Sequence, residues 1–388
     1  MNTTSCEAAL ELRPPSGESP ASAALMFAAG VLGNVTALGL LLRARARRRA
    51  RRERLAPFHV LVMALVLTDL LGTCLLSPVV LAAYGRRRTL RGLSDGGGVC
   101  LYFAFAMSFF SLATMGCLGA MALERSLAIG APYLYERLLS ARPVAPLLLA
   151  ALPALYALAA AFCALPLLGF GRYVQYCPGT WCFIQMHFPR AGGAAELSSG
   201  GAFSLLYASL LLLLILAVLL CNLSVIVNLL RMQRRGKATR RATAAAAAAA
   251  SSSSSSQLRQ TESSDGQAPS PRCAARKQLS MFEELDHLIL LAIITITFAV
   301  CSLPFTVRAF MNHFDPGVDY KEDLQAMRFL SFNSIIDPWV FAILRPPILR
   351  VIRSVLCCRV PLKPRTTDRQ RPPFAKPKPV EQAGICRQ

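Results

Sequence analysis

The chain has 388 residues, of which 54% are hydrophobic and only 16% are charged, with a formal net charge of +21. Soluble domains of this length are less apolar and carry more charge, so the composition excludes an ordinary soluble protein. A charge of +21 could suggest nucleic-acid binding. The positions of the basic residues along the chain decide whether that interpretation holds.

Seven apolar blocks follow one another along the chain. A hydrocarbon core of about 30 Å needs about 20 apolar helical residues, and each block is long enough. Seven such blocks leave no plausible soluble core, so we predict an all-α integral membrane protein, a seven-transmembrane-helix bundle. The predicted spans are Ala21–Leu42, Pro57–Tyr84, Val99–Ile129, Pro143–Phe170, Ala202–Leu230, Leu285–Phe310 and Leu324–Leu344.

Most of the 42 Lys and Arg residues lie between an odd-numbered span and the next span, or in the tail. The positive-inside rule places these segments in the cytoplasm. We therefore predict a multi-pass plasma-membrane protein with its N-terminus outside. One outer loop disagrees, since it carries Arg86, Arg87, Arg88 and Arg91. The basic excess is best explained by anionic membrane lipids as partners, and not by nucleic acid.

The N-terminal segment, residues 1–20, has neither the basic start nor the apolar middle of a signal peptide. It is expected to be extracellular and to precede the seven-helix bundle of residues 21–345. Asn2 begins the sequence Asn-Thr-Thr, a glycosylation sequon, although many sequons go unused.

Three cytoplasmic segments differ from the bundle in composition. Residues 231–284 carry alanine and serine runs that cannot bury a core, so we predict a long disordered loop. Residues 346–358 have an apolar stripe among arginines, which is typical of an amphipathic helix on the membrane surface. Cys357 and Cys358 end that helix as a candidate palmitoylation site. Residues 359–388 are expected to form a disordered tail.

Thirteen cysteines show no metal-ligand spacing, so we expect no metal and no cofactor. Four of them fall on the oxidising outer side: Cys6, Cys100, Cys177 and Cys182. An even number permits two disulfides. The sequence also shows no set of catalytic residues, so we predict that the protein is not an enzyme.

Polar residues inside the predicted spans need an explanation, because they are costly in a bilayer. Asn34, Asp69, Asn333 and Asp337 form one such set. They could join helices by hydrogen bonds, or they could form an ion and water site that rearranges on activation. Both interpretations require side chains that face the bundle interior.

Three charged sites are also open to two interpretations. Glu124-Arg125 ends the third span, where snorkelling charges are common. Arg328 lies nine residues before Asp337, about 13 Å nearer the outside. It either snorkels to the interface or pairs with an anionic ligand, for which a guanidinium is well suited. Arg308 is closer to the water, and we expect it to snorkel.

Together these motifs resemble the rhodopsin-like G-protein-coupled receptors and, more narrowly, the prostanoid receptors. Two departures from the general family are shared by prostanoid receptors: the sixth span lacks a tryptophan before Pro304, and the seventh has Asp337 and Phe341 in place of Asn and Tyr. The matching motifs are Gly33-Asn34, Thr68-Asp69-Leu70, Glu124-Arg125 and Asp337-Pro338-Trp339-Val340-Phe341.

The most specific stretch, Gln175–Phe183, looks like the second extracellular loop that covers the prostanoid pocket. Arg328 matches the family arginine that binds the prostanoid carboxylate. The resemblance implies a ligand site of nine residues. In it the ligand carboxylate meets Arg328, Thr180 and Tyr84, and the apolar chains lie among Met26, Met107, Phe103 and Leu324. Trp181 and Ser331 complete the site. For Met26, Met107 and Leu324, ordinary packing is an equal alternative.

The resemblance also implies a disulfide between Cys100 and Cys182, which tethers the loop to the third span. A second bridge between Cys6 and Cys177 would follow the prostacyclin receptors. The implied activation and coupling set is Glu124, Arg125, Asp69, Asn34, Asn333, Asp337, Pro338 and Pro304. In it, Arg125 leaves Glu124 when the sixth span opens.

Within the family, the chain is most similar to the second, Gs-coupled subtype of prostaglandin E receptor. This implies prostaglandin E2 as ligand and cyclic AMP as output, with a heterotrimeric G protein, arrestin and receptor kinases as partners. A receptor for prostacyclin or prostaglandin D2 is the alternative. An organic-anion transporter is disfavoured, because repeated halves and interrupted helices are not visible. Ser126 and Ala23 depart from the usual residues, which bears on coupling and affinity.

Overall fold

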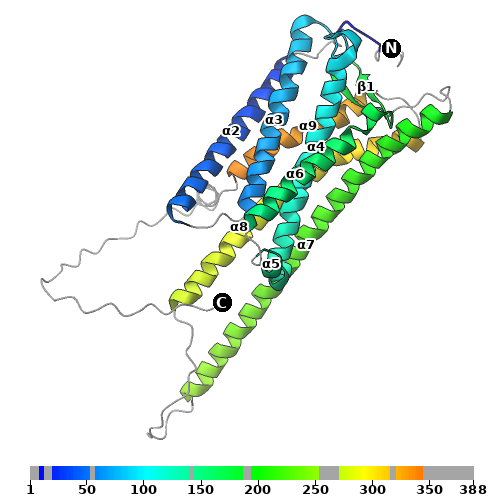
Figure 1. Cartoon of the computed structure of the whole chain (residues 1–388). Helices are drawn as coiled ribbons and strands as arrows, with labels where there is room; N and C mark the ends of the chain where they lie inside the picture. Colours follow the sequence, from blue (N-terminus) through cyan, green and yellow to red (C-terminus); the bar gives the residue numbers. More distant parts are fainter. Residues whose placement is uncertain are drawn as a thin grey trace, which may run out of the picture.

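The structure, a computed structural model, describes residues 8–12, 20–52, 57–139, 144–186, 194–252, 271–314 and 320–343. Seven long helices in these residues pack into an elongated bundle (Figure 1). In chain order they correspond to the seven predicted spans. They are α2 (Pro20–Ala50), α3 (Pro57–Arg86), α4 (Gly98–Gly130), α6 (Val144–Cys163), α7 (Ala194–Ser252), α8 (Pro271–Phe314) and α9 (Tyr320–Ile343).

The described connections add short elements at both ends of the bundle. An antiparallel hairpin of β1 (Tyr173–Tyr176) and β2 (Trp181–Ile184) lies at the outer end, with Tyr176 opposite Trp181. The other short elements are η1 (Asp95–Gly97), α5 (Pro132–Leu139) and η2 (Leu165–Leu168).

Five helices in the described residues are long and apolar enough to cross a membrane: α2, α3, α4, and the segments Gly201–Met232 of α7 and Ala292–Phe314 of α8. The described apolar part of α6, Ala150–Cys163, is shorter. Leucines such as Leu213 and Leu220 are 62% and 65% exposed on the outside of the bundle. Such apolar surfaces are compatible with lipid contact, whereas α9 carries polar residues that its packing buries.

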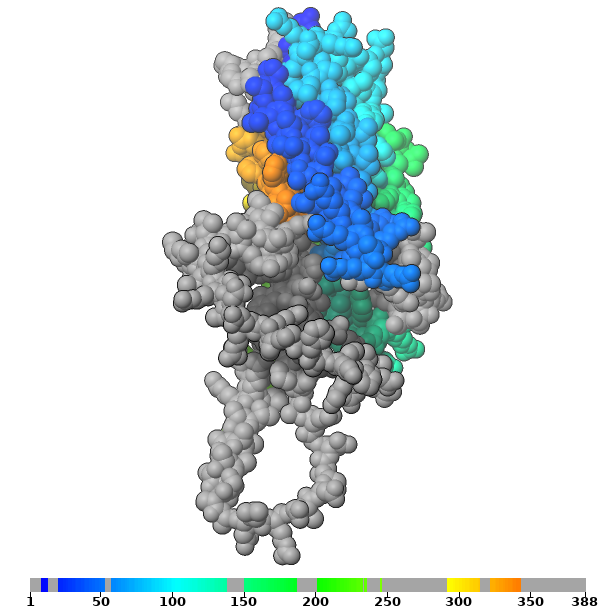
Figure 2. Space-filling model, turned by 90° about the vertical axis from the view of Figure 1, so that its left-hand side faces the viewer, coloured from blue at the N-terminus to red at the C-terminus, as the bar shows by residue number. Residues whose placement is uncertain are grey.

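The helix α4 lies at the centre of the bundle and contacts α3, α6, α7 and the hairpin. Its middle turns are fully enclosed, as at Cys117, Leu118 and Met121. Gly116 permits the contact with α6, because a Cβ there would lie 2.7 Å from a methyl of Leu155. At the edge of the bundle, α2 packs against both α3 and α9. Figure 2 shows α3 and α9 on either side of α2.

The predicted disordered loop, residues 231–284, is helical at both of its described ends. The helix α7 continues through Ser252 and α8 begins at Pro271, so both extend beyond their apolar segments (Figure 1). The alanine run lies within α7, since alanine has the highest helix propensity. The predicted surface helix, tail, Asn2, Cys6, Cys357 and Cys358 lie outside the described residues.

Candidate functional site

The hairpin is held over the outer end of the bundle by a disulfide. Cys182 of β2 is joined to Cys100 of α4 with a Cα–Cα distance of 5.4 Å, which confirms the predicted bridge. Cys177, in the turn, is also disulfide-bonded, and its predicted partner Cys6 lies outside the described residues. The hairpin is therefore fixed at two points, its turn and its second strand.

The turn of the hairpin is pressed against the first outer loop. Gly179 has a φ of +113°, which favours glycine, and a Cβ there would lie 2.4 Å from the Thr89 methyl. Its carbonyl accepts a hydrogen bond from the Leu90 N–H at 2.9 Å. A side chain at Gly179 would push the two loops apart.

Residues 8–12 form a strap across the same two loops. Leu12 N–H donates to the Arg87 carbonyl, and Thr89 N–H donates to the Leu10 carbonyl, both at 3.1 Å. The Ala9 carbonyl accepts from the Thr89 hydroxyl at 2.7 Å and from the side-chain amide of Gln175 in β1 at 3.0 Å. This segment carries no motif that could have predicted its contacts.

Beneath the hairpin lies a cavity of about 310 Å³, at the small end of the usual range of ligand pockets, about 300–1,000 Å³. Seven of the nine predicted ligand residues line it: Arg328, Trp181, Tyr84, Ser331, Met26, Met107 and Phe103. Arg328 is the one basic residue among the described residues that line the cavity. Phe103 and Trp181 meet edge to face, with ring centroids 5.7 Å apart, and so join α4 to the hairpin in the cavity wall.

Two predicted ligand residues do not line the cavity. Thr180 is 1% exposed and lies in the hairpin turn, directly before Trp181 at the start of β2. Its hydroxyl oxygen has no hydrogen-bond partner among the described residues. Leu324 is buried in α9, one turn nearer the outside than Arg328. Both residues are buried, and neither lines the cavity in this arrangement of the bundle.

The inner end of the cavity is polar, because part of the predicted interior set lines it. The Thr114 hydroxyl donates to Asp69 Oδ1 at 2.9 Å, and the Asn333 amide donates to the Ser302 hydroxyl at 3.3 Å. Asp69, Thr114 and Asn333 all line the cavity. One continuous space thus joins Arg328 to Asp69.

The other two members of the interior set lie deep in the bundle as well. The Asn34 amide of α2 donates to the Ser334 carbonyl of α9 at 2.9 Å, so Asn34 does join helices. Asp337 is 2% exposed, and neither of its carboxyl oxygens has a hydrogen-bond partner among the described residues.

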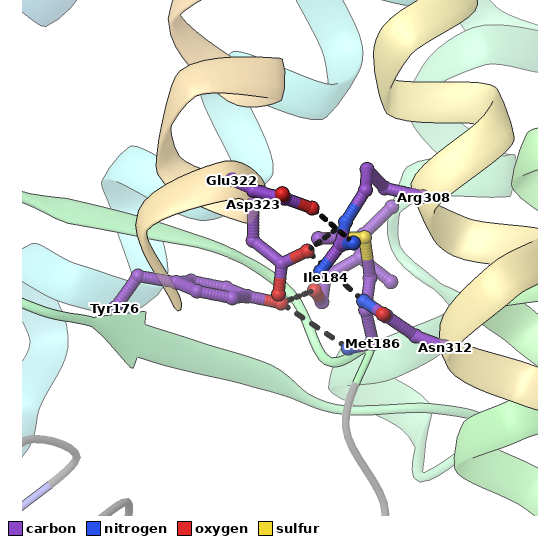
Figure 3. Close-up of polar contacts among 7 residues, drawn as sticks. All are labelled: Tyr176, Ile184, Met186, Arg308, Asn312, Glu322 and Asp323. Carbon is purple, nitrogen blue, oxygen red and sulfur yellow. Dashed lines mark hydrogen bonds and ion pairs between the residues drawn. The ribbon is translucent and has the colours of Figure 1, made fainter. Parts of the chain in front are cut away.

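The two arginines of the outer half differ in their surroundings. Arg328 is half-buried and lines the cavity. Arg308 was expected to snorkel, and that prediction is wrong: its side chain is only 12% exposed and pairs with Asp323 and Glu322 of α9 (Figure 3). Spacing along the sequence does not indicate this pairing, because the partners are fifteen residues apart and lie on two different helices.

At the opposite end of α4, Glu124 and Arg125 are buried and paired. Arg125 Nε lies 2.6 Å from Glu124 Oε2, and Nη2 lies 2.8 Å from Oε1. The Tyr135 hydroxyl of α5 donates to the same Oε1 at 2.9 Å, and the Arg125 guanidinium lies 4.8 Å from the centre of the Phe58 ring. A link between α7 and α8 lies in the same half, where the Asn222 amide donates to the Thr295 hydroxyl at 2.8 Å.

The family model described as "7 transmembrane receptor (rhodopsin family)" matches residues 33–341 of the chain. The chain belongs to this receptor family. The predicted seven-helix fold is thereby confirmed, and the family consists of multi-pass membrane receptors and not of enzymes. Squid rhodopsin has the same fold, with a TM-score of 0.63 and 13% identity over 91% of this chain and 93% of that one.

The receptor is also similar to curated relatives that bear out the predicted resemblance to prostanoid receptors. It is 55% identical over 363 residues to the human prostaglandin E2 receptor EP2 subtype, which covers 91% of this chain and 90% of the relative. The dog protein of the same name is 55% identical over 353 residues, 90% of this chain and 88% of that one. The human prostacyclin receptor is 43% identical over 381 residues, 95% and 86% of the two chains.

Several cavity residues of the receptor were missed by sequence reasoning. They come from five helices: Ser22, Leu76, Val80, Phe110, Ser111, Phe298 and Ser334. Serines and apolar residues are common on every face of a membrane helix, so nothing in their pattern marked them. Tyr135 was missed for another reason: it lies outside the predicted spans, and its partner Glu124 is eleven residues away.

Proposed function

We propose that this receptor binds prostaglandin E2 at the cell surface and signals through Gs to raise cyclic AMP. The observation that carries the proposal is the 55% identity to the human prostaglandin E2 receptor EP2 subtype over 363 residues. The cavity supports it, because one guanidinium in a largely apolar wall suits a molecule with one carboxylate and long hydrocarbon chains.

In this proposal, Arg328 binds the ligand carboxylate as a charge-assisted pair, with the Tyr84 hydroxyl beside it. Met26, Phe103 and Met107 contact the apolar chains. Ser331 and Trp181 complete the site near the ring and beneath the hairpin. Thr180 and Leu324 would contact the ligand only after β2 or α9 moves, since neither lines the cavity.

Activation is proposed to be a shift between two arrangements of the bundle. Ligand binding favours the arrangement in which the cytoplasmic end of α8 opens and Arg125 leaves Glu124 to receive the G protein. Pro304, and the polar set of Asn34, Asp69, Asn333, Asp337 and Pro338, would transmit the change from the cavity. Arrestin and receptor kinases are the further partners of the open state.

The proposed topology places the N-terminus outside, with Asn2 glycosylated. The loop 231–284 and the tail 359–388 would lie in the cytoplasm. Residues 346–358 would lie on the inner leaflet, attached through palmitoylated Cys357 and Cys358. Protection of the tail, but not of the N-terminal segment around Asn2, from protease added to intact cells would support this orientation.

The test is cyclic AMP in cells that express the full chain, titrated with prostaglandin E2, prostaglandin D2 and a stable prostacyclin analogue. We expect the lowest half-maximal concentration for prostaglandin E2. A response led by the prostacyclin analogue would favour the alternative suggested by the 43% identical relative. Silence to all three, with the receptor at the surface, would contradict the proposed ligand class.

The Arg328→Ala variant tests the anchor. Hydrogen bonds to charged groups contribute about 1.5–3 kcal/mol, so we expect the half-maximal concentration of prostaglandin E2 to rise by about tenfold to a hundredfold. Arg86→Ala is the matched control, since Arg86 is an exposed arginine at the outer end of α3 that does not line the cavity. Equal effects of the two variants would argue against a specific anchor.

A further inference from the structure

The outer ends of α8 and α9 are joined by a cluster of four polar side chains. Arg308 Nε donates to Asp323 Oδ1 at 2.8 Å, and Arg308 Nη1 donates to Glu322 Oε2 at 2.6 Å. The Asn312 amide donates to the same Asp323 oxygen at 3.0 Å. Figure 3 shows the guanidinium between the two carboxylates, and the Tyr176 side chain of β1 points toward this cluster.

The two ion pairs of the cluster differ in burial. Asp323 is 0% exposed and Arg308 12%, whereas Glu322 is 58% exposed. Removal of one partner from a buried pair is strongly unfavourable, because it leaves an uncompensated charge. An exposed pair contributes little. The Arg308–Asp323 pair is therefore the buried ionic link between the two helix ends, and Glu322 adds little to it.

The pair lies close to the proposed ligand anchor along α9 but faces a different direction. Asp323 precedes Arg328 by five residues, about 7.5 Å along the axis and about 140° around it. Asp323 faces α8, and Arg328 faces the cavity. A rotation of α9 that separated Asp323 from Arg308 would therefore also turn Arg328 away from the cavity.

The cluster also affects which cation meets the ligand. Two carboxylates occupy the Arg308 guanidinium, and Arg308 does not line the cavity. Among the described residues that line it, Arg328 alone is basic. A carboxylate in the cavity is thus directed to one cation, Arg328. The position of Arg328 along α9 and around the helix axis depends on the Arg308–Asp323 pair.

We propose that Arg308 and Asp323 are positioning residues for ligand recognition, which set the rotation of α9 so that Arg328 meets the acid group of the ligand. This inference rests on the proposed function. It makes a specific claim: loss of the pair should weaken the binding of a carboxylate more than the binding of the same molecule without that charge.

The experiment measures binding to membranes that carry the full chain, by competition against tritiated prostaglandin E2. Prostaglandin E2 is compared with its analogue in which the carboxyl group is replaced by a primary alcohol. Asp323→Asn removes the buried charge and keeps the side-chain size. We expect about a tenfold loss of affinity for the acid, which is the size of effect that residues coupled to a site without contacting its ligand can have. The affinity for the alcohol should be unchanged.

The matched control is Glu322→Gln, which makes the same chemical change on the exposed carboxylate next to Asp323. It should alter the affinity for the acid by less than about twofold. Exchange of the pair, Arg308→Asp with Asp323→Arg, should recover part of the affinity for the acid, because it restores opposite charges at the two positions.

Two results would overturn the inference while leaving the proposed function intact. Equal losses for acid and alcohol in Asp323→Asn would show a general packing defect. Unchanged affinity for both, at wild-type surface level, would show that the pair does not position Arg328. If the wild-type receptor binds no prostaglandin E2, the proposed function fails, and the inference fails with it.

Discussion

The outer and inner halves of the bundle are held together in different ways. The outer half has a disulfide from α4 to β2, a buried ion pair from α8 to α9, and the strap of residues 8–12 across two loops. In the inner half, the described polar links between elements include the hydrogen bonds from Tyr135 to Glu124 and from Asn222 to Thr295.

This difference fits the two tasks proposed for the receptor. A ligand that is recognised through one carboxylate needs a cation at a fixed position, which covalent and buried ionic links provide. A G-protein site that forms only on activation needs helices that can separate. The neutral hydrogen bond from Asn222 to Thr295, which joins α7 to α8, contributes about 0.5–1.5 kcal/mol, so a ligand with a modest preference for the open arrangement can break it.

The largest expected effect comes from breaking the covalent link of the outer half. Cys182→Ser opens a disulfide that spans 82 residues, for which chain entropy alone predicts a constraint of about 4–5 kcal/mol. We expect specific binding of tritiated prostaglandin E2 to fall by at least about tenfold. Cys74→Ser is the control, because Cys74 is a free, exposed cysteine. Unchanged binding would show that the hairpin does not need its tether.

An intermediate effect is expected from the buried pair of the inner half. Glu124→Gln weakens the hold on Arg125, which Glu124 contacts at 2.6 and 2.8 Å. If this pair favours the inactive arrangement, basal cyclic AMP should rise several-fold at equal surface expression. Glu136→Gln changes an exposed glutamate of α5 and should leave the basal level near that of the wild type. A fall in basal signal would reverse the proposed role.

The smallest effect is expected from the single hydrogen bond between α5 and α4. Tyr135→Phe removes the hydroxyl that donates to Glu124 Oε1, and the basal signal should rise by about twofold. Tyr133 offers a close control, since it is 79% exposed on the same helix. The comparison of Tyr135→Phe with Tyr133→Phe isolates the bond itself, and identical signals would assign it no role in the switch.

The span positions and the fold could be predicted from the sequence, because bilayer-length apolar blocks are a local property of the chain. The Cys100–Cys182 bridge and the seven of the nine predicted ligand residues that line the cavity followed from the resemblance to prostanoid receptors. The loop 231–284 shows where composition misled: the absence of an apolar face argued against packing, yet alanine still continues α7 beyond its apolar part.

Arg308 and Arg328 show most clearly what the sequence by itself left undecided. Both are single arginines in apolar segments, and residue type and spacing allowed a snorkelling role for either. The sequence determined that charged groups stood at these depths. Only the packing of α8 against α9 decided that Arg308 meets Asp323, fifteen residues away, while Arg328 faces the cavity. Which partner a buried charge meets depends on the rotation of each helix and on its neighbours, and these are properties of the assembled bundle.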